Sequence, residues 1–380
     1  MRSLLLLFFA LFSILANAQL LIKNTSVIDV ENKKILAGQD VLIENGIISA
    51  IGKKLNASSA VNTIDGTGKY LMPGLIDAHI HFFQTGSIYT RPDAIDLRKY
   101  KSYEDEIKWA HQHMENFMRR YLRMGVTSVI DVGSSVNFLK QRDSFRNKTY
   151  APSVYMTGPL LTTFEPPIYK GLGDDSPFYL MKSVEDAKTY VQKQLPYKPD
   201  FIKIWYIVQG RNTDSAARSN LPKVKSVIEE AHKNNLRVAV HATEEITARL
   251  AVEAGADFLV HGREDKIVDD SFVQLLKNRK TVMSPTMVVA GNYYKVFGQM
   301  YKVTEEDFHY AHPAPLNSVI DLKALPDTQL TGRYKTAVRG NISRLHTDDS
   351  IRRINLKKLS DGGVILATGT DAGNIGTQHA

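Results

Sequence analysis

The chain of 380 residues carries 48 lysines and arginines against 40 aspartates and glutamates, and it contains no cysteine. Without cysteine there can be no disulfide bond, thiolate metal ligand or cysteine nucleophile, so a transition metal would have to be bound by histidine, carboxylate or a less usual ligand. The net charge of +8 is not gathered into basic runs interleaved with aromatic residues, so nucleic acid is not an expected partner.

The first 18 residues have the pattern of a cleaved secretory signal. A short basic start is followed by an apolar stretch from Leu4 to Leu15 and by the sequence Ala16-Asn17-Ala18 before Gln19. The apolar stretch is too short to span a bilayer comfortably and no stop-transfer pattern follows it, so an uncleaved anchor is the less favoured alternative. The sequence predicts a secreted or periplasmic protein that begins at Gln19 and has no stable membrane span.

Residues 19–70 read as the N-terminal part of a small β domain. Apolar and polar residues alternate along "LLIKNTSVIDV" and "DVLIENGIISAIG". The second stretch is interrupted at Asn45-Gly46, a pair that favours a two-residue hairpin turn with positive φ at both positions. A small all-β segment is therefore expected before the main domain.

From residue 71 to residue 380, short apolar runs alternate with helical patterns, as in a parallel sheet built from βα units. The predicted strands are 75–82, 127–133, 153–161, 201–207, 237–242, 257–262, 281–289 and 364–372. Eight strands separated by helices predict an α/β fold, a (β/α)8 TIM barrel with its active site at the C-terminal strand ends. An open doubly wound sheet is the alternative, but the Gly-x-Gly-x-x-Gly loop expected after its first strand is absent.

Local signals also predict helix starts and one insertion. Ser102 and Ser183 have capping-box spacing to a following aspartate, and Pro222 is expected in the first turn of a helix. The connection 290–363 is far longer than an ordinary loop and contains helical patches. Such an insertion commonly covers or shapes the pocket of a barrel, although a helical excursion without this role fits the sequence equally well.

The segment "PGLIDAHIHF" ends its predicted strand with two histidines. In an extended chain His79 and His81 project to one side while Ile80 projects to the other, so two imidazoles can share a metal ion. His111 and His113 have the same spacing, but their surroundings are helical, and residues two apart on a helix do not face each other. A metal site is therefore expected at the first pair and not at the second.

Ionisable side chains recur at the C-terminal ends of the predicted strands. They are His79, His81, Lys203, His241, His261 and Asp371. A lone histidine at such a position is more often a buried core residue than a ligand, and the aspartate of "GTDAG" could simply cap a turn. Four histidines and an aspartate at equivalent strand ends are difficult to explain in this way, and they indicate a metal site.

Lys203 lies between Ile202 and Ile204 in the predicted fourth strand, where an unpaired ammonium group would be costly. The alternative is a long side chain that reaches solvent at the rim of the barrel. Burial would lower the pKa of the amine, and a neutral amine can add carbon dioxide to become a carbamate. Such a group would supply a carboxylate-like bridge between two cations.

Six segments occur in the order "VLIENGIISAIG", "IDGTGKYLMPGLIDAHIHF", "DFIKIW", "VAVHA", "FLVHG" and "GTDAG". From about residue 20 onward they resemble the amidohydrolase superfamily of metal-dependent hydrolases, and look closest to its branch of imidazolonepropionase-like proteins and Xaa-Pro dipeptidases. Lys203 matches the dipeptidase-like pattern and argues against the one-metal imidazolonepropionase and deaminase patterns. Members normally continue beyond the eighth strand, so the small β domain is expected to be incomplete at the C-terminus: a fragment is the favoured interpretation, and a half-built small domain with unpaired strand edges is the alternative.

The resemblance implies two divalent metal ions, with zinc expected, bound by the strand-end residues named above. One ion would lie between His79, His81 and Asp371, and the other between the histidines of the fifth and sixth strands. Carboxylated Lys203 would bridge the two ions.

The resulting hypothesis is a secreted metal-dependent amidohydrolase that cleaves an amide or peptide C–N bond with a metal-bridged hydroxide, with Asp371 as the catalytic proton acceptor and donor. The expected substrate is a small molecule or dipeptide, first an Xaa-Pro dipeptide or an N-acyl amino acid. One alternative is an imidazolonepropionase-like enzyme with a single metal ion, either a cyclic-amide hydrolase or a deaminase. The other is a non-catalytic secreted binding protein. The sequence leaves homo-oligomerisation open.

Three further residues have subordinate expected roles. Asp131 either supports the ligands or forms a turn, and His379 supports or caps rather than ligates. Arg263 either binds a substrate carboxylate or pairs with Glu264 in solvent.

Overall fold

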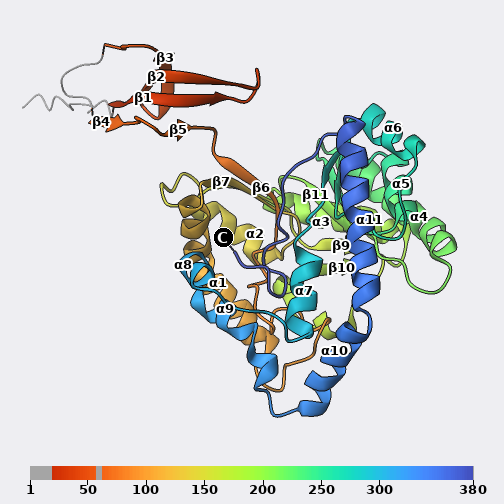
Figure 1. Ribbon diagram of the computed structural model, residues 1–380. Helices are drawn as coiled ribbons and strands as arrows, with labels where there is room; N and C mark the ends of the chain where they lie inside the picture. Colours follow the sequence, from red (N-terminus) through yellow and green to blue (C-terminus); the bar gives the residue numbers. More distant parts are fainter. Residues whose placement is uncertain (1–18, 57–61, 380) are drawn as a thin grey trace, which may run out of the picture. The chain divides into compact units, whose positions relative to one another are not determined.

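The computed structural model describes residues 19–56 and 62–379 (Figure 1). The predicted signal at 1–18 lies outside the described residues. The chain divides into two compact units, Met1–Gly74 and Leu75–Ala380, which are called the N-terminal unit and the main unit below. Within the described ranges, no helix is long and apolar enough to cross a membrane.

The N-terminal unit is a small sheet. Its strands are β1 (Gln19–Asp29), β2 (Lys34–Glu44), β3 (Ile47–Gly52), β4 (Asn62–Asp65) and β5 (Tyr70–Leu71). The strand order is β3-β2-β1-β4, with β5 also paired to β1, and the β1–β2 and β2–β3 pairs are antiparallel. Asn45 and Gly46 join β2 to β3 with φ of 52° and 78°, so the predicted hairpin turn is confirmed.

The main unit contains two parallel sheets. One has the order β6-β7-β8, made of Leu75–Ile80, Val126–Asp131 and Ser153–Met156. The other has the order β10-β9-β11-β12-β13-β14. Its strands are β9 (Leu160–Thr162), β10 (Phe178–Leu180), β11 (Ile202–Trp205), β12 (Val238–His241), β13 (Phe258–Val260) and β14 (Val282–Ser284). The α/β class and the parallel strand direction are therefore as predicted.

The hydrogen bonding among the described residues differs from one continuous eight-stranded barrel. The predicted strand 153–161 is divided into β8 and β9, because Pro159 lies between them and has no N–H group for a ladder. The predicted strand 364–372 is held by isolated bridges instead of a regular ladder. These are parallel bridges of Leu366 with Met283 and of Ala372 with Ile80. The last stretch thus lies between β14 and β6.

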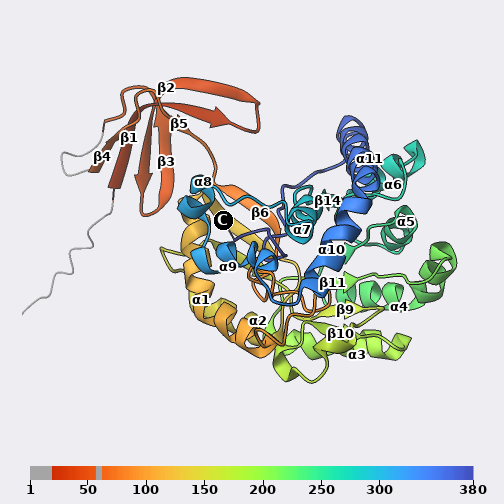
Figure 2. The ribbon, with the colours of Figure 1, turned by 60° about the horizontal axis from the view of Figure 1, so that its bottom comes forward.

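Helices α1 to α6 lie around the outside of the strands (Figure 2). They are α1 (Tyr103–Arg123), α2 (Val136–Arg142), α3 (Val184–Gln194), α4 (Thr213–Lys233), α5 (Glu245–Glu253) and α6 (Asp270–Arg279). Ser102 and Ser183 accept hydrogen bonds from backbone N–H groups at the starts of α1 and α3, as predicted. The prediction for Pro222 is wrong, because α4 already begins at Thr213, where Asn212 caps it.

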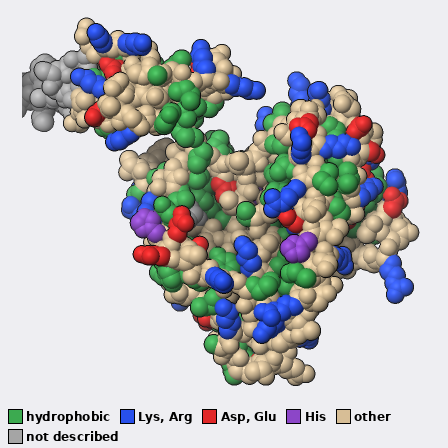
Figure 3. All heavy atoms as spheres, viewed as in Figure 1, with side chains coloured by type: hydrophobic (Ala, Val, Ile, Leu, Met, Phe, Trp, Pro, Cys, Tyr) green, Lys and Arg blue, Asp and Glu red, His purple; other side chains and the backbone are tan. Residues whose placement is uncertain are grey.

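The long connection is helical and packs onto the main unit. Its helices are α7 (Val289–Phe297), α8 (Glu305–Tyr310), α9 (Pro313–Ser318), α10 (Thr328–Gly340) and α11 (Ile342–Asp361). A hydrophobic cluster that includes Val296 and Val319 joins this insertion to Ile88 and Ile95 of the segment after β6. On the face of the main unit drawn in Figure 3, basic side chains lie singly or in small groups among acidic and uncharged ones.

Candidate metal centre

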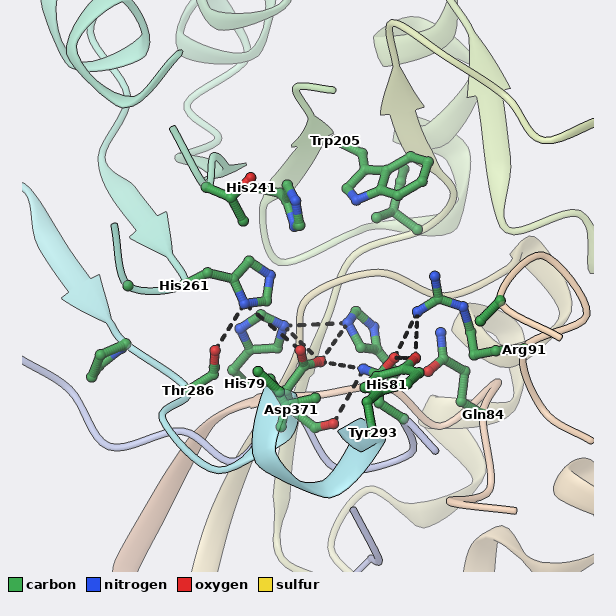
Figure 4. Close-up of a pocket in the computed structure, with 18 of the residues that line it drawn as sticks. His79, His81, Gln84, Arg91, Trp205, His241, His261, Thr286, Tyr293 and Asp371 are labelled. Carbon is green, nitrogen blue, oxygen red and sulfur yellow. Dashed lines mark hydrogen bonds and ion pairs between the residues drawn. The ribbon is translucent and has the colours of Figure 1, made fainter. Parts of the chain in front are cut away.

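All the predicted ligands line one cavity of about 470 Å³ in the main unit (Figure 4). They are His79 and His81 from the end of β6, Lys203 from β11, His241 from the end of β12, His261 directly after β13, and Asp371. The strands run parallel and end at the same edge, so side chains that are far apart in the sequence meet there. Aromatic side chains, among them Trp205 and Tyr293, form part of the remaining wall.

Three ligand atoms face one another at the centre of this cluster. The Nε2 atoms of His79 and His81 are 3.2 Å apart, and each lies 3.2 Å from Oδ1 of Asp371. A tetrahedral zinc ion with bonds of about 2.0–2.1 Å would separate its ligands by about 3.3 Å. Lone-pair donors turned toward one another at this spacing fit a bound cation.

The surroundings of His79 and His81, at and just after the end of β6, suit metal ligation. Nδ1 of His81 lies 2.8 Å from the carbonyl oxygen of Gly133, and as a donor there it leaves the Nε2 lone pair free. Burial lowers the pKa of His79 to about 4, so this imidazole is uncharged at neutral pH.

The second part of the cluster contains His261 and His241. Nδ1 of His261 lies 3.7 Å from Oδ2 of Asp371 and 2.8 Å from the hydroxyl of Thr286. The ring centres of His241 and His261 are 4.3 Å apart. Burial, followed by repulsion from Lys203, holds the pKa of His241 well below its usual value, so it is also available as a neutral ligand.

His79, His261 and Asp371 can each offer one ligand atom within 4.8 Å of the others. His241 lies outside this compact group and touches it through the His261 ring. His111 and His113 do not converge, as predicted: their ring nitrogens lie by Gln141 and by the carbonyl oxygen of Trp109.

Lys203 is 1% exposed, so its side chain does not reach solvent at the rim. Burial lowers its pKa to about 7, although the charges of Asp371 and Asp131 favour the ammonium form. A large fraction of this amine is therefore neutral and nucleophilic near neutral pH. No carboxylate among the described residues forms an ion pair with it.

The buried lysine predicts a pH dependence of stability for the metal-free chain. The pKa of Lys203 is about 7 in the folded chain, against an ordinary value of 10.5. Between these values the unfolded chain binds the additional proton, so the free energy of unfolding rises with pH. Urea denaturation without carbon dioxide should give a higher midpoint at pH 9 than at pH 7, and Lys203→Met should remove most of this rise. An unchanged rise in the variant would show that Lys203 is not the group responsible.

Asp371 is positioned by a relay that the sequence analysis did not identify. Nδ2 of Asn374 donates to Oδ1 of Asp371 at 2.6 Å, and its Oδ1 accepts from Arg91 at 2.6 Å and from the Tyr293 hydroxyl at 2.8 Å. Arg91 is in turn fixed by two hydrogen bonds to Asp93, at 2.8 and 2.7 Å. The relay joins the loop after β6, the insertion and the last segment. Its members Arg91, Tyr293 and Asp371 are labelled in Figure 4. It fixes which carboxylate oxygen faces the imidazoles.

Two buried aspartates support the ligands from behind. Asp77 accepts from the backbone N–H of His79 at 3.2 Å and from the Thr370 hydroxyl at 2.6 Å, which ties β6 to the segment before Asp371. Asp131 accepts from the backbone N–H groups of Phe82 and Gly133 at 3.0 and 3.1 Å. The supporting role considered for Asp131 fits these contacts. Asp77 was not among the predicted residues, although its position two residues before His79 could have indicated it.

His379 and Arg263 do not line the cavity. His379 is buried, with Nδ1 2.8 Å from the Tyr121 hydroxyl and Nε2 2.8 Å from the carbonyl oxygen of Gln84, which agrees with a supporting role. Arg263 is also fully buried and donates from Nη2 to the carbonyl oxygens of Val260 and His261. Neither expectation for Arg263 is therefore right: it is not at the cavity surface, and it forms no ion pair with Glu264.

Sequence relatives match only part of their own length. The dihydroorotase of Trichlorobacter lovleyi is 47% identical over 70 residues, which are 18% of this chain and 16% of that protein. The dihydropyrimidinase of Dictyostelium discoideum is 43% identical over 63 residues, 17% of this chain and 12% of that protein. These matches span less than a fifth of the length of either relative.

Similar solved structures share the fold over most of the chain. An Xaa-Pro dipeptidase with methionine in its active site has a TM-score of 0.65 at 22% identity, covering 94% of this chain and 80% of that one. A prolidase complexed with N-methylphosphonate-L-proline has a TM-score of 0.65 at 18% identity, covering 95% and 80%. The sequence profile of the Amidohydrolase family matches residues 70–379. Because this match covers most of the chain, the protein belongs to the amidohydrolase family.

Proposed function

We propose that the protein is a metal-dependent hydrolase that cleaves an amide or peptide C–N bond of a small substrate. The observation that carries this proposal is the convergence of His79, His81 and Asp371 at 3.2 Å in a cavity that also contains Lys203 and two more histidines. Family membership and the fold shared with a prolidase and an Xaa-Pro dipeptidase support it.

Two divalent cations, zinc by preference, fit this set of donors. His79, His81 and Asp371 would hold one ion, and His241 and His261 the other. Lys203 would lie between them as a carbamate: its neutral nitrogen attacks the carbon of carbon dioxide and loses a proton, which leaves an N-bound carboxylate. When bound, the ions would supply an acidified water and a polarised substrate carbonyl.

Asp371 is the proposed proton carrier. Its Oδ1 is engaged by Asn374 and faces both imidazoles, whereas Oδ2 points toward His261 with a separation of 3.7 Å. Oδ2 can therefore accept the proton of the attacking water and then deliver it to the leaving nitrogen. The relay through Asn374 keeps the carboxylate in this orientation.

An Xaa-Pro dipeptide is the proposed first substrate, and an N-acyl amino acid is the second. A cavity of about 470 Å³ with an aromatic wall can enclose molecules of this size. We further propose that the two parallel sheets and residues 364–372 form one barrel wall, and that the predicted signal directs export.

The test is release of amine from a panel of Xaa-Pro dipeptides and N-acyl amino acids by the full-length chain. Turnover should occur with at least one compound, disappear with a zinc chelator and return with added zinc. Hydrolysis of a cyclic amide alone would favour the mononuclear alternative. Metal binding without turnover of any dipeptide, N-acyl amino acid or cyclic amide would favour a binding protein.

A further inference from the structure

Helix α11 of the insertion is anchored beside a proposed metal ligand. Asn355 is 1% exposed and donates to the carbonyl oxygens of Arg263 and Lys266 at 3.1 and 2.9 Å, while it accepts from the N–H of Val268 at 2.9 Å. These hydrogen bonds tie α11 to the loop that follows His261. The insertion is therefore fixed relative to the proposed metal centre.

Arg352, one turn before Asn355, lies in the wall of the cavity that contains the metal ligands. Its side chain is 7% exposed. The residue after His261 is Gly262, and a Cβ at that position would lie 3.2 Å from Cγ of Arg352. The absence of a side chain at Gly262 thus makes room for the arginine next to the cluster.

The guanidinium group of Arg352 has fewer hydrogen bonds than a buried arginine needs. Among the described residues, Nη1 donates to Oε2 of Glu264 at 2.8 Å, and Nη2 is 3.9 Å from Oδ1 of Asp349. Nε is buried without a partner. An arginine carries five N–H donors in a planar fork, so most of this fork is unused in a place that water reaches poorly.

The other cations at the cavity do not offer such a fork. Arg91 is already paired through two hydrogen bonds with Asp93 and bonded to Asn374 and Tyr293. Lys203 belongs to the proposed metal bridge, and Arg263 does not line the cavity. In a purely structural ion pair, the carboxylate would accept two parallel hydrogen bonds from the guanidinium group. Glu264 instead accepts one hydrogen bond from Arg352, and its side chain is 41% exposed.

We propose that Arg352 binds the carboxylate of the substrate, and that it makes the enzyme selective for the free acid over the amide of the same compound. A planar carboxylate can accept two parallel hydrogen bonds from the fork. Glu264 is the counter-ion that is displaced when the carboxylate binds. That the bound carboxylate belongs to a substrate rests on the proposed function. The test measures binding and does not require turnover.

The experiment is calorimetric titration of the zinc-loaded full-length chain with the N-methanesulfonyl derivatives of L-proline, L-alanine and L-phenylalanine, each as free acid and primary amide, because their sulfonamide bond has no acyl carbonyl to be hydrolysed. At least one acid should bind about ten- to a hundred-fold more tightly than its amide, as expected for hydrogen bonds to a charged group. Arg352→Met should abolish this preference, and Arg352→Lys should retain part of it. Glu264→Gln should increase the affinity for the acid, because the competing charge is removed.

Arg353 is the matched control, since it lies on the same helix but is 72% exposed and pairs with Asp349. Arg353→Met should keep the full preference for the acid. Equal binding of acids and amides by the unaltered chain, or a preference that persists in Arg352→Met, would overturn the proposal. If no compound of the substrate panel is hydrolysed but the acid preference depends on Arg352, the proposed function fails and the carboxylate site stands.

Discussion

Lys203→Ala is expected to lose most of the bound metal and to lower kcat/KM by more than about a hundred-fold. The reason is that Lys203 is buried within the same cavity as the histidines, where only a carbamate would give it oxygen ligands. Added acetate or propionate should restore part of the activity, because a short carboxylate can fill the vacated space. Lys203→Arg should not be rescued, because a guanidinium cannot form the carbamate and repels cations.

The control for this result is Lys225→Ala on α4, where the lysine is 61% exposed and pairs with Glu229. It should have unchanged metal content and turnover. Normal metal content and normal rates in Lys203→Ala would show that Lys203 does not bridge. A one-metal site built on His79, His81, His261 and Asp371 would then be the better description.

Asp371→Asn is expected to lower kcat by about 10² to 10⁴-fold with a smaller change in KM. An amide has nearly the shape of the carboxylate but cannot accept the proton of the attacking water. Its effect should therefore fall on the chemical step. Steady-state kinetics of the zinc-loaded variant on the best substrate of the panel would measure this, with its metal content as the check that the ligand role of Asp371 is kept and circular dichroism as the check of folding.

Asp361→Asn on α11 is the matched control, since Asp361 is 63% exposed and pairs with Lys357. It should behave as the unaltered chain does. If Asp371→Asn kept its kcat, the proton would have to be carried by another group, and the role given to Asp371 would be wrong.

The sequence predicted the strand-end residues because parallel strands impose a simple geometry. In the structure Trp205 pairs in register with His241, and His241 with Val260, so the ends of β11, β12 and β13 coincide. Alternation along β6 likewise brings the Nε2 atoms of His79 and His81 to the same point. These features follow from strand periodicity and did not require knowledge of tertiary packing.

The supporting residues could not be predicted in this way. Arg91 and Asn374 lie on loops, where no periodic pattern fixes the direction of a side chain. Tyr293 and Arg352 lie on helices α7 and α11 of the insertion, and the local sequence does not show that these helices pack beside the cavity. Arg263 shows how the simple rule fails. An extended chain would direct it to the same side as His261, but His261 has a φ of 74°, and this left-handed residue breaks the alternation.

The strand boundaries were also only partly predictable. The run 153–161 looks continuous in hydrophobicity, yet Pro159 interrupts its ladder. The run 364–372 does not form a regular strand. Within it, the hydroxyl of Thr368 donates to the carbonyl oxygen of Ile76, and the hydroxyl of Thr370 donates to the carboxylate of Asp77. Side-chain hydrogen bonds of this kind depend on a partner nearly three hundred positions away, and local sequence patterns do not reveal them.

The most direct test of the metal-dependent mechanism is the metal content of the purified full-length chain, measured by inductively coupled plasma mass spectrometry together with turnover before and after chelation. The proposed site predicts about two zinc-like ions per chain, with activity that falls as the ions are removed and returns as they are restored. A chain that contains no divalent metal, and that hydrolyses its substrate at the same rate with and without the chelator, would contradict it.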